Sequence, residues 1–547
     1  MSPRPEAEAA SAWLRRPLLA AALLSLLVFG PAVGAGFVWD DLFLVEALPR
    51  PGLPVPWSAL LGVDLAQAGL ASGGEGAGYF RPLLLLGLWA EATLGGAAAP
   101  NLGHLHSLLW QLLALAGLDA WARREGLGPA ARALSLVIFG LHPLQVEPVV
   151  WISARADLML SAASLWALAR GAPTGPRSAA VLAGLGLLAG LAKDQGALLP
   201  LALVATSGPR AAGAAGIGVG LAWLLRAWAG VGAPPAGLAD AAQVLPTLLQ
   251  ISARDVLLPL ELHPGEHLAW SPPPPALPLV GLLLGLLLVV LAGKGAALRG
   301  LGVATLAYLP ASLAVGGLGL VGLRYHHLPL AGLALALGAA VDRGLGPRPT
   351  AVLVAALALP LAALSARALP GWASDAPFWE AAVARHPNAY TYAGRALDRL
   401  DRGELDAAAP DLHEATLGPR PMRLACEVIA EVHLQRGDLV AAAAEGRRAL
   451  AAGCPPTAGL LGPTAAALVG VGAVDAAAQL ARAMPEDPRS FGLLVRIADE
   501  ARRGASDALA GAPPEARAAL AGQAAALLEA GGEQAAAERL RAAASSP

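Results

Sequence analysis

Charged residues are scarce in this chain. They make up 14% of its 547 residues, where soluble domains carry roughly 25%, and the net charge is only −2. This shortage excludes an ordinary cytosolic protein and a disordered chain, and the missing positive excess excludes a nucleic-acid binder. Two cysteines are too few for a fold built on disulfides. Because 56% of the residues are hydrophobic, the sequence predicts an integral membrane protein.

Long apolar segments fill the chain up to about residue 370. Residues 17–36 carry no charge and are about one bilayer long. A cleaved signal peptide is the alternative, but no clear cleavage site follows and many apolar segments do. Further expected spans are 101–120, 133–148, 157–170, 178–192, 195–209, 211–230, 274–293, 300–318, 321–341 and 349–367. The total is about eleven. Segments 82–97 and 240–260 are expected to lie along the membrane interface.

The charges divide the chain into two expected domains. Residues 1–370 form a polytopic membrane domain, and residues 371–547 are rich enough in charge to be compatible with water. Arg and Lys between the spans favour a cytoplasmic N-terminus, and an odd number of spans then places the second domain outside the cytoplasm.

The second domain contains repeated fragments. RGELDAA at 402–408, RGDLVAA at 436–442 and VGAVDAA at 471–477 place three glycines 34 and 35 residues apart, and GGEQAAA follows at 531–537. This period is typical of tetratricopeptide (TPR) repeats, and an Ala-rich helical bundle is the alternative. Both are all-α and typical of domains that bind peptides or proteins. Cys426 and Cys454 could form a disulfide in an oxidising compartment or remain two buried thiols.

Ionisable residues gather in the segments assigned to the outer face. Independent surface charges would divide between the two sides, so this clustering indicates one polar pocket. The residues are Asp40 and Asp41 in FVWDDLF, Arg81 in GYFRPL, His142, Glu147, Arg155 and Asp157 in LHPLQVEPVVWISARAD, Lys193 and Asp194 in LAKDQG, and Arg324, Tyr325, His326 and His327 in GLRYHHLP.

Such a pocket suits transfer of a group from a lipid phosphate to a hydroxyl. Paired carboxylates offer a general base, Arg and Lys bind phosphate, and an apolar groove beside them would hold a lipid tail. A carboxylate–histidine set could also hold a divalent cation such as Mg²⁺ or Mn²⁺. Structural roles compete with these interpretations: an aspartate of the pair can cap a helix, and Arg324 can pair with a helix end. Trp39, Trp151 and Trp372 are assigned to the aromatic belt at the membrane interface.

These motifs together resemble the transmembrane and tetratricopeptide-repeat protein O-mannosyltransferase family, in the GT-C class of glycosyltransferases. The similarity rests on FVWDD, YFRPL, LHPLQVEPVVWISARADLM, LAKDQGALLP and RYHHLPLAG, followed by the repeats. It implies an all-α fold of about eleven spans followed by a TPR-like solenoid. It also implies a polyprenyl-phosphate-linked sugar as donor and a protein or glycan hydroxyl as acceptor.

The resemblance also assigns roles to residues. One of Asp40 and Asp41 is the base, and Asp157 orients the site. The remaining substrate-binding candidates include three cations for the departing phosphate, Arg155, Lys193 and Arg324, together with Arg81, His142, Glu147, Tyr325 and His327. The sequence departs from the family pattern at Gln145, Leu323 and His327, where a histidine, an acid and an aromatic residue are expected.

Two functions from different classes compete. The first is a membrane glycosyltransferase of GC-rich bacterial origin, in the inner membrane, with the repeats on the periplasmic side. The second is a membrane-anchored interaction scaffold or an inactive relative. Buried polar residues gathered at one face favour the enzyme, because an anchor has no need of them. A transporter is disfavoured, because no pair of broken helices recurs in two halves.

Overall fold

The computed structural model describes residues 16–47, 80–232, 238–260, 262, 266–267, 295–318, 320–417, 421–471, 473, 476–477, 479–480, 525 and 534–544. These residues are helical apart from turns and two short strands, β1 (Glu266–His267) and β2 (Leu320–Val321), which pair antiparallel. The predicted all-α class is confirmed for this part of the chain.

The chain forms two compact units, with the boundary between Ala381 and Ala382. The first unit contains the helices α2 (Pro17–Phe29), α3 (Asp40–Ala47), α6 (Pro82–Gly95), α7 (Ala99–Arg124), α8 (Pro129–Leu141), α9 (Val146–Val150), α10 (Arg155–Arg170), α11 (Pro176–Ala192), α12 (Leu199–Ser207), α13 (Pro209–Trp228), α14 (Leu238–Leu257), α16 (Ala296–Leu318), α17 (His327–Gly344) and α18 (Pro347–Ala368). The 3₁₀ turns η1 (Gly30–Gly34), η2 (Gly96–Ala98), η3 (Pro143–Gln145), η4 (Ile152–Ala154), η5 (Asp194–Leu198), η6 (Leu323–His326) and η7 (Leu369–Trp372) connect them.

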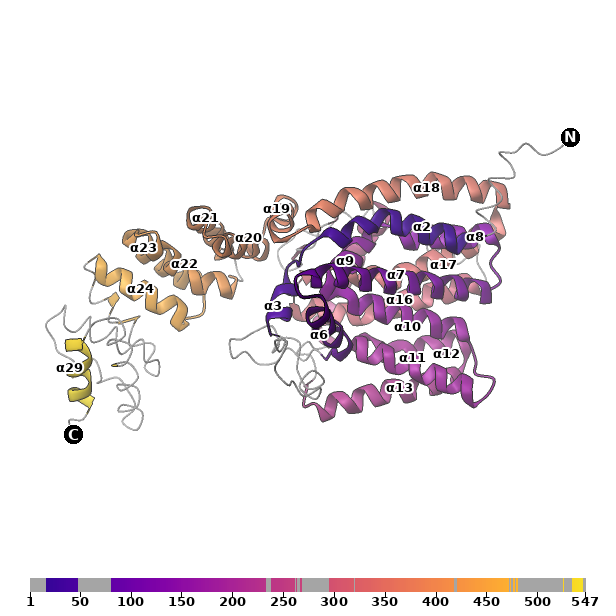
Figure 1. Ribbon diagram of the computed structural model, residues 1–547, viewed down its shortest axis with the longest axis horizontal. Helices are drawn as coiled ribbons and strands as arrows, with labels where there is room; N and C mark the ends of the chain where they lie inside the picture. Colours follow the sequence, from indigo (N-terminus) through magenta and orange to yellow (C-terminus); the bar gives the residue numbers. More distant parts are fainter. Residues whose placement is uncertain are drawn as a thin grey trace. The chain divides into compact units, whose positions relative to one another are not determined.

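Proline sets where many of these helices begin. The first residue of α2, α6, α8, α11, α13 and α18 is proline, at the position where the missing N–H has no partner to lose. Neighbouring helices then pack side by side in the bundle, with α10 against α7 and α11, α11 against α13, and α16 against α17 (Figure 1). Small residues allow the closest approaches. A Cβ at Gly218 of α13 would overlap the carbonyl oxygen of Ala183 in α11, so only glycine fits there.

Several helices are long and apolar enough to cross a membrane. Within the described residues these are Pro17–Gly34, Pro82–Arg124, Pro209–Trp228 and Pro347–Trp372, and a pair bent by 52°, Pro129–Leu141 with Pro143–Val150, makes up to five. Several apolar helices are thus compatible with a membrane protein, whereas the count of about eleven spans stays a prediction. The segment 82–97, expected at the interface, belongs to the apolar stretch Pro82–Arg124. The expected span 274–293 lies outside the described residues.

Connections between helices fall at two ends of the bundle. One end carries the turns before α3, between α8 and α10, between α11 and α12, and between α16 and α17. The other end carries the turns between α7 and α8, α10 and α11, α12 and α13, and α17 and α18. The polar motifs found in the sequence lie in the first group of turns. The second group is flanked by many arginines, among them Arg123, Arg124, Arg170, Arg177, Arg210, Arg343 and Arg348.

The boundary between the units falls within α19 (Asp375–Arg385). It therefore lies about ten residues after the change in composition that the sequence places near residue 370. The second unit contains α20 (Ala389–Asp401), α21 (Leu405–Ala415), α22 (Arg423–Gln435), α23 (Leu439–Ala451), α24 (Ala458–Gly470) and α29 (Gln534–Ala544). Gly403 and Gly437 have φ of 74° and 76° and join α20 to α21 and α22 to α23. The described helices thus form helix–turn–helix pairs where the repeats predict them. Gly472 and Gly532 lie outside the described residues, and a TPR solenoid remains a prediction.

A disulfide links Cys426 in α22 to Cys454, which follows α23, with their Cα atoms 5.8 Å apart. Both cysteines are buried in the apolar core of the second unit. Of the two alternatives left by the sequence, the structure therefore has the bonded pair.

Candidate functional site

The acidic pair begins α3 directly after a strained residue. Trp39 has φ of 59° and is the non-glycine residue with positive φ in the described part of the chain. A bulky side chain adopts this conformation only where the surrounding structure enforces it, and such residues cluster at functional sites. The strained backbone fixes where the first turn of α3 starts and thereby sets the directions of Asp40 and Asp41.

The two aspartates occupy different environments. Asp41 is fully buried, and both of its carboxylate oxygens accept hydrogen bonds. Oδ1 accepts from the backbone N–H of Ser153 at 2.8 Å and from the Ser153 hydroxyl, and Oδ2 accepts from the Val38 N–H at 3.2 Å. Asp40, in contrast, is exposed to solvent. Asp41 therefore holds α3 against η4, and Asp40 has the accessible carboxylate.

Loss of hydration raises the pKa of both aspartates. Loss of hydration raises the pKa of Asp41 to about 7, although its hydrogen bonds from Ser153 and Val38 act in the opposite direction. The pKa of Asp40 is raised to about 6, first by the desolvation that the surrounding protein causes, while Arg324 and Arg81 lower it and Asp375 raises it. Asp40 thus combines an accessible carboxylate with a raised pKa, as a general base requires.

Three cationic side chains lie close enough to influence the Asp40 carboxylate or one another electrostatically. The positive charges of Arg324 and Arg81 both lower the pKa of Asp40. Burial lowers the pKa of Lys193 to about 8, and the same two arginines act in the same direction. Arg81 is half-buried, whereas Arg324 and Lys193 are buried. Arginine and lysine side chains at the end of a helix bundle are donors from which phosphate oxygens could accept hydrogen bonds.

Two acids hold two of these cations in place. Lys193 Nζ donates to both oxygens of Asp157, at 2.6 and 2.8 Å. Arg324 donates to Glu147 Oε1 at 2.6 Å, and Glu147 Oε2 accepts from the Leu323 N–H at 2.8 Å. The predicted residues Glu147, Asp157, Lys193 and Arg324 thus lie as two ion pairs, from α9, α10, the turn after α11 and η6.

Aromatic rings pack beside the charges. Trp39 stacks on Trp151 with 4.4 Å between ring centroids, and the Arg324 guanidinium lies 4.8 Å from both the Trp151 and the Tyr325 rings. Lys193 Nζ lies 5.1 Å from the Tyr325 ring. Trp39, Trp151 and Trp372 are 9%, 3% and 1% exposed, so the prediction that they form an aromatic belt is wrong. They are buried packing partners, and Trp39 and Trp151 hold the acidic turn and Arg324 together.

Arg155 lies in a different polar cluster. Its guanidinium donates to Glu91 Oε1 at 2.5 Å and Oε2 at 3.1 Å, to the Gly103 carbonyl at 3.0 Å and to Ser107. His106 Nδ1 lies 2.7 Å from Glu91 Oε1, and Trp110 donates to His106 Nε2. The guanidinium of Arg155 is fully buried and its hydrogen bonds connect α10 to α6 and α7.

The predicted histidines have protein partners. His142 caps η3 by accepting from the Leu144 N–H, while its Nε2 lies 3.1 Å from the Val256 carbonyl. His327 lies between Ser161 and Gln111, at 2.7 and 3.0 Å, inside the bundle. Gln145, where the resemblance expects a histidine, is fully buried, and neither atom of its amide has a hydrogen-bond partner.

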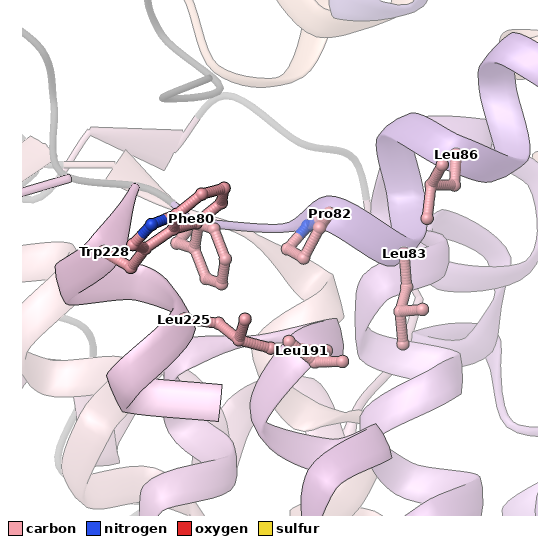
Figure 2. Close-up of a pocket in the computed structure, with 7 residues that line it drawn as sticks. All are labelled: Phe80, Pro82, Leu83, Leu86, Leu191, Leu225 and Trp228. Carbon is pink, nitrogen blue, oxygen red and sulfur yellow. The ribbon is translucent and has the colours of Figure 1, made fainter. Parts of the chain in front are cut away.

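An apolar pocket opens beside Arg81. Figure 2 shows its lining residues, which come from the start of α6, the end of α11 and the end of α13. They are Phe80, Pro82, Leu83, Leu86, Leu191, Leu225 and Trp228. The cavity has a volume of about 60 Å³. Phe80 and Pro82 flank Arg81 in the chain, and Leu191 comes two residues before Lys193, so the apolar lining and these two cations belong to the same segments.

A divalent cation does not fit the described residues. They include no group of three or more His, Cys, Asp or Glu side chains placed to hold a metal ion. Both oxygens of Asp41 accept protein hydrogen bonds, Asp157 is paired with Lys193, and arginines act on Asp40. An Mg²⁺ or Mn²⁺ ion at Asp40 would have to compete with these fixed positive charges.

Sequence patterns alone do not single out three residues that the structure shows to be partners of the predicted ones. Glu91 is the one acid within the apolar segment 82–97, a signal that was available. Ser153 lies within the WISARAD motif, but a serine carries no sign of which carboxylate it will meet. Asp375, which accepts from the Trp39 N–H at 2.6 Å, is far away in sequence, and only the fold reveals the contact.

Comparisons with known proteins find one partial similarity of relevance. A stretch of 135 residues, 25% of this chain, is 30% identical to the protein O-mannosyl-transferase Tmtc2 of Drosophila melanogaster. The match covers 14% of that protein, so the two chains share a minor part of their lengths. No protein-family model matches the chain, and no solved structure matches it. The chain is therefore a helical protein with distant, partial similarity to a protein O-mannosyltransferase.

Proposed function

We propose that the protein is a membrane glycosyltransferase that moves a sugar from a polyprenyl-phosphate donor to a hydroxyl group of an acceptor. The observation that carries this proposal is the accessible Asp40 carboxylate beside Arg324 and Arg81, at the end of an apolar bundle with an apolar pocket alongside. The partial similarity to a protein O-mannosyl-transferase supports mannose as the sugar and a protein as the acceptor.

In the proposed reaction, Asp40 is the general base. Its carboxylate takes the proton of the acceptor hydroxyl as the hydroxyl oxygen attacks the anomeric carbon. The new bond to the acceptor oxygen forms while the bond from the anomeric carbon to the phosphate oxygen breaks, and the bonding electron pair leaves on the phosphate. The configuration at the anomeric carbon is inverted. Asp41 does not touch the substrates; it positions α3 through Ser153 and Val38.

The cations would stabilise the leaving group. Charge develops on the bridging phosphate oxygen as the sugar departs, and fixed positive charges with little access to water stabilise it strongly. Arg324 and Lys193 are held ready by Glu147 and Asp157, which prevents them from turning toward solvent. Arg81 joins them from the segment that lines the apolar pocket, where the first isoprene units of the donor would lie.

We also propose an orientation in the membrane. The arginine-rich end of the bundle would face the cytoplasm, and the end with Asp40 would face the outside, in a bacterium the periplasm. In the chain, the second unit comes after α18, whose last residues lie at the Asp40 end of the bundle. Its disulfide between Cys426 and Cys454 supports an oxidising compartment for that unit.

The test uses purified full-length protein in lipid and a panel of polyprenyl-phosphate sugars, mannose first. Release of polyprenyl phosphate is followed with acceptor peptides rich in serine and threonine. Asp40→Asn should lower the release rate by about 10²-fold or more, because the general base is lost. Asp342→Asn is the matched control, since Asp342 is an exposed aspartate at the other end of the bundle.

Either result is informative. Release that depends on Asp40 and on one donor supports the transferase and names its sugar. If the folded wild type releases polyprenyl phosphate from no donor, the transferase proposal fails. The helix pairs of the second unit would then carry the function, as in an interaction scaffold, and the ligand of those pairs would be sought instead.

A further inference from the structure

The strained turn that presents Asp40 is held from two sides. On one side the Trp39 ring stacks on Trp151, and Asp41 bonds back to the Val38 N–H and to Ser153. On the other side lies the segment that follows the last apolar helix. The Gly36 N–H donates to the Ala373 carbonyl at 2.9 Å, and the Trp39 N–H donates to Asp375 Oδ1 at 2.6 Å.

The same segment covers the Trp39 ring. Phe378 and Trp379 of α19 lie 5.5 and 6.1 Å from it, measured between ring centroids, and Trp372 packs on Phe378 at 4.9 Å. All of these residues belong to the first compact unit, which ends at Ala381, while α19 itself continues to Arg385. Residues 372–379 thus pack against the acidic turn, although they come after the last apolar helix in the chain.

We infer that Asp375 is a positioning residue for Asp40, and that the start of α19 holds the acidic turn in its working conformation. The inference rests on the proposed role of Asp40 as the base. An acceptor that fixes the Trp39 N–H stabilises a backbone conformation that tryptophan otherwise avoids. Without that acceptor, the Trp39 N–H loses its hydrogen bond, the contacts of Gly36 with Ala373 and of the rings remain, and the Asp40 carboxylate is held less firmly in its direction.

Asp375 also contributes charge. Four charged groups act on Asp40 from the elements around it: Arg324 in η6, Arg81 before α6, Asp41 beside it and Asp375 in α19. The Asp375 carboxylate opposes a second negative charge on Asp40 and so favours its protonated form. The hydrogen bond and the charge can be separated, because asparagine keeps an acceptor oxygen and loses the charge.

The experiment compares Asp375→Ala and Asp375→Asn in the full-length protein. Glu380→Gln is the matched control, because Glu380 is an exposed acid on the same helix. The first readout is amide hydrogen exchange of the peptide that covers residues 36–41, which requires no substrate. We expect exchange about tenfold faster in Asp375→Ala, because the Trp39 N–H loses its acceptor, and little change in Asp375→Asn or Glu380→Gln.

The second readout is the pH profile of polyprenyl-phosphate release. Asp375→Asn should move the acid limb to lower pH at nearly unchanged maximal rate, and Asp375→Ala should lower the maximal rate about tenfold at unchanged donor KM. A purely structural residue would not shift the acid limb without lowering the maximal rate.

The outcomes separate this inference from the proposed function. Unchanged exchange in Asp375→Ala overturns the inference whatever the activity. Faster exchange with unchanged release kinetics in both variants also overturns it, since the turn would then be held without effect on Asp40. A wild type without release, but with the expected exchange, contradicts the transferase and leaves the support of the turn by Asp375 established.

Discussion

Ser153 donates both its backbone N–H and its hydroxyl to the same oxygen of Asp41, so one residue of η4 fixes the second acid of the pair. We expect Ser153→Ala to lower the free energy of unfolding by about 1–2 kcal/mol, because a buried acceptor loses a donor. The release rate should fall as well, because α3 would shift. Ser365→Ala, which removes a buried serine bonded to the Leu141 carbonyl, should cost similar stability and leave the release rate unchanged. Thermal unfolding and initial rates check both variants, and equal rates in the two would contradict the role given to Asp41.

The pH dependence of release should have an acid limb near pH 6. Asp40 must be ionised to accept a proton, and desolvation by the surrounding protein raises its pKa to about 6, so activity rises as the pH increases through that value. Arg324 lowers this pKa, so Arg324→Gln should move the limb to higher pH and also weaken donor binding. A profile of kcat/KM between pH 4 and 9 measures both effects. A limb that stays in place in Arg324→Gln would show that Asp40 is not the titrating group.

Variants of the ion pair between Asp157 and Lys193 should change the free energy of unfolding and the activity in different ways. Both side chains are about 95% buried, and removal of one partner leaves the other charge buried alone, which costs about 3–5 kcal/mol. We expect Asp157→Asn and Lys193→Gln to be strongly destabilised and the double variant to be less destabilised than the sum of the two. The double variant should remain poorly active, because the phosphate loses a cation.

Denaturant unfolding of the four proteins gives the coupling energy of this pair, and donor KM gives the functional effect. Additive destabilisation would show that the pair does not form. Recovery of the wild-type KM in the double variant would show that Lys193 does not bind the donor.

The disulfide should stabilise the second unit and leave the chemistry unaffected. Its cysteines are 28 residues apart, and closing a loop of this size contributes about 2–4 kcal/mol. We expect reductant, or Cys426→Ala with Cys454→Ala, to lower the Tm of the second unit without changing Asp40-dependent release. Mass spectrometry after alkylation should find no free thiol in protein exported to an oxidising compartment. Two alkylated thiols in that material would contradict the proposed placement of the second unit.

The sequence predicts site residues well where a residue type is rare and has few possible roles, as charged residues do in an apolar chain. Asp40, Arg81, Lys193 and Arg324 stood out because charge is rare in an apolar chain, and the structure brings them into one neighbourhood. The sequence does not predict which side chains pair with one another in the fold. Arg155 looked equivalent to Lys193 and Arg324, yet Glu91, more than sixty residues earlier, occupies its guanidinium. The tryptophans fitted an aromatic belt by position, yet they are buried around the acidic turn.

Sequence alone specifies the apolar character of the chain, the helical class and the change to helix pairs after about residue 370. These follow from composition and local patterns, which act over a few residues. The fold, in contrast, establishes which aspartate is exposed and which is hydrogen-bonded, which cations have partners elsewhere, and that Asp375 accepts a hydrogen bond from the Trp39 N–H. Those outcomes depend on which distant side chains meet and which lose access to water, and local sequence carries no record of either.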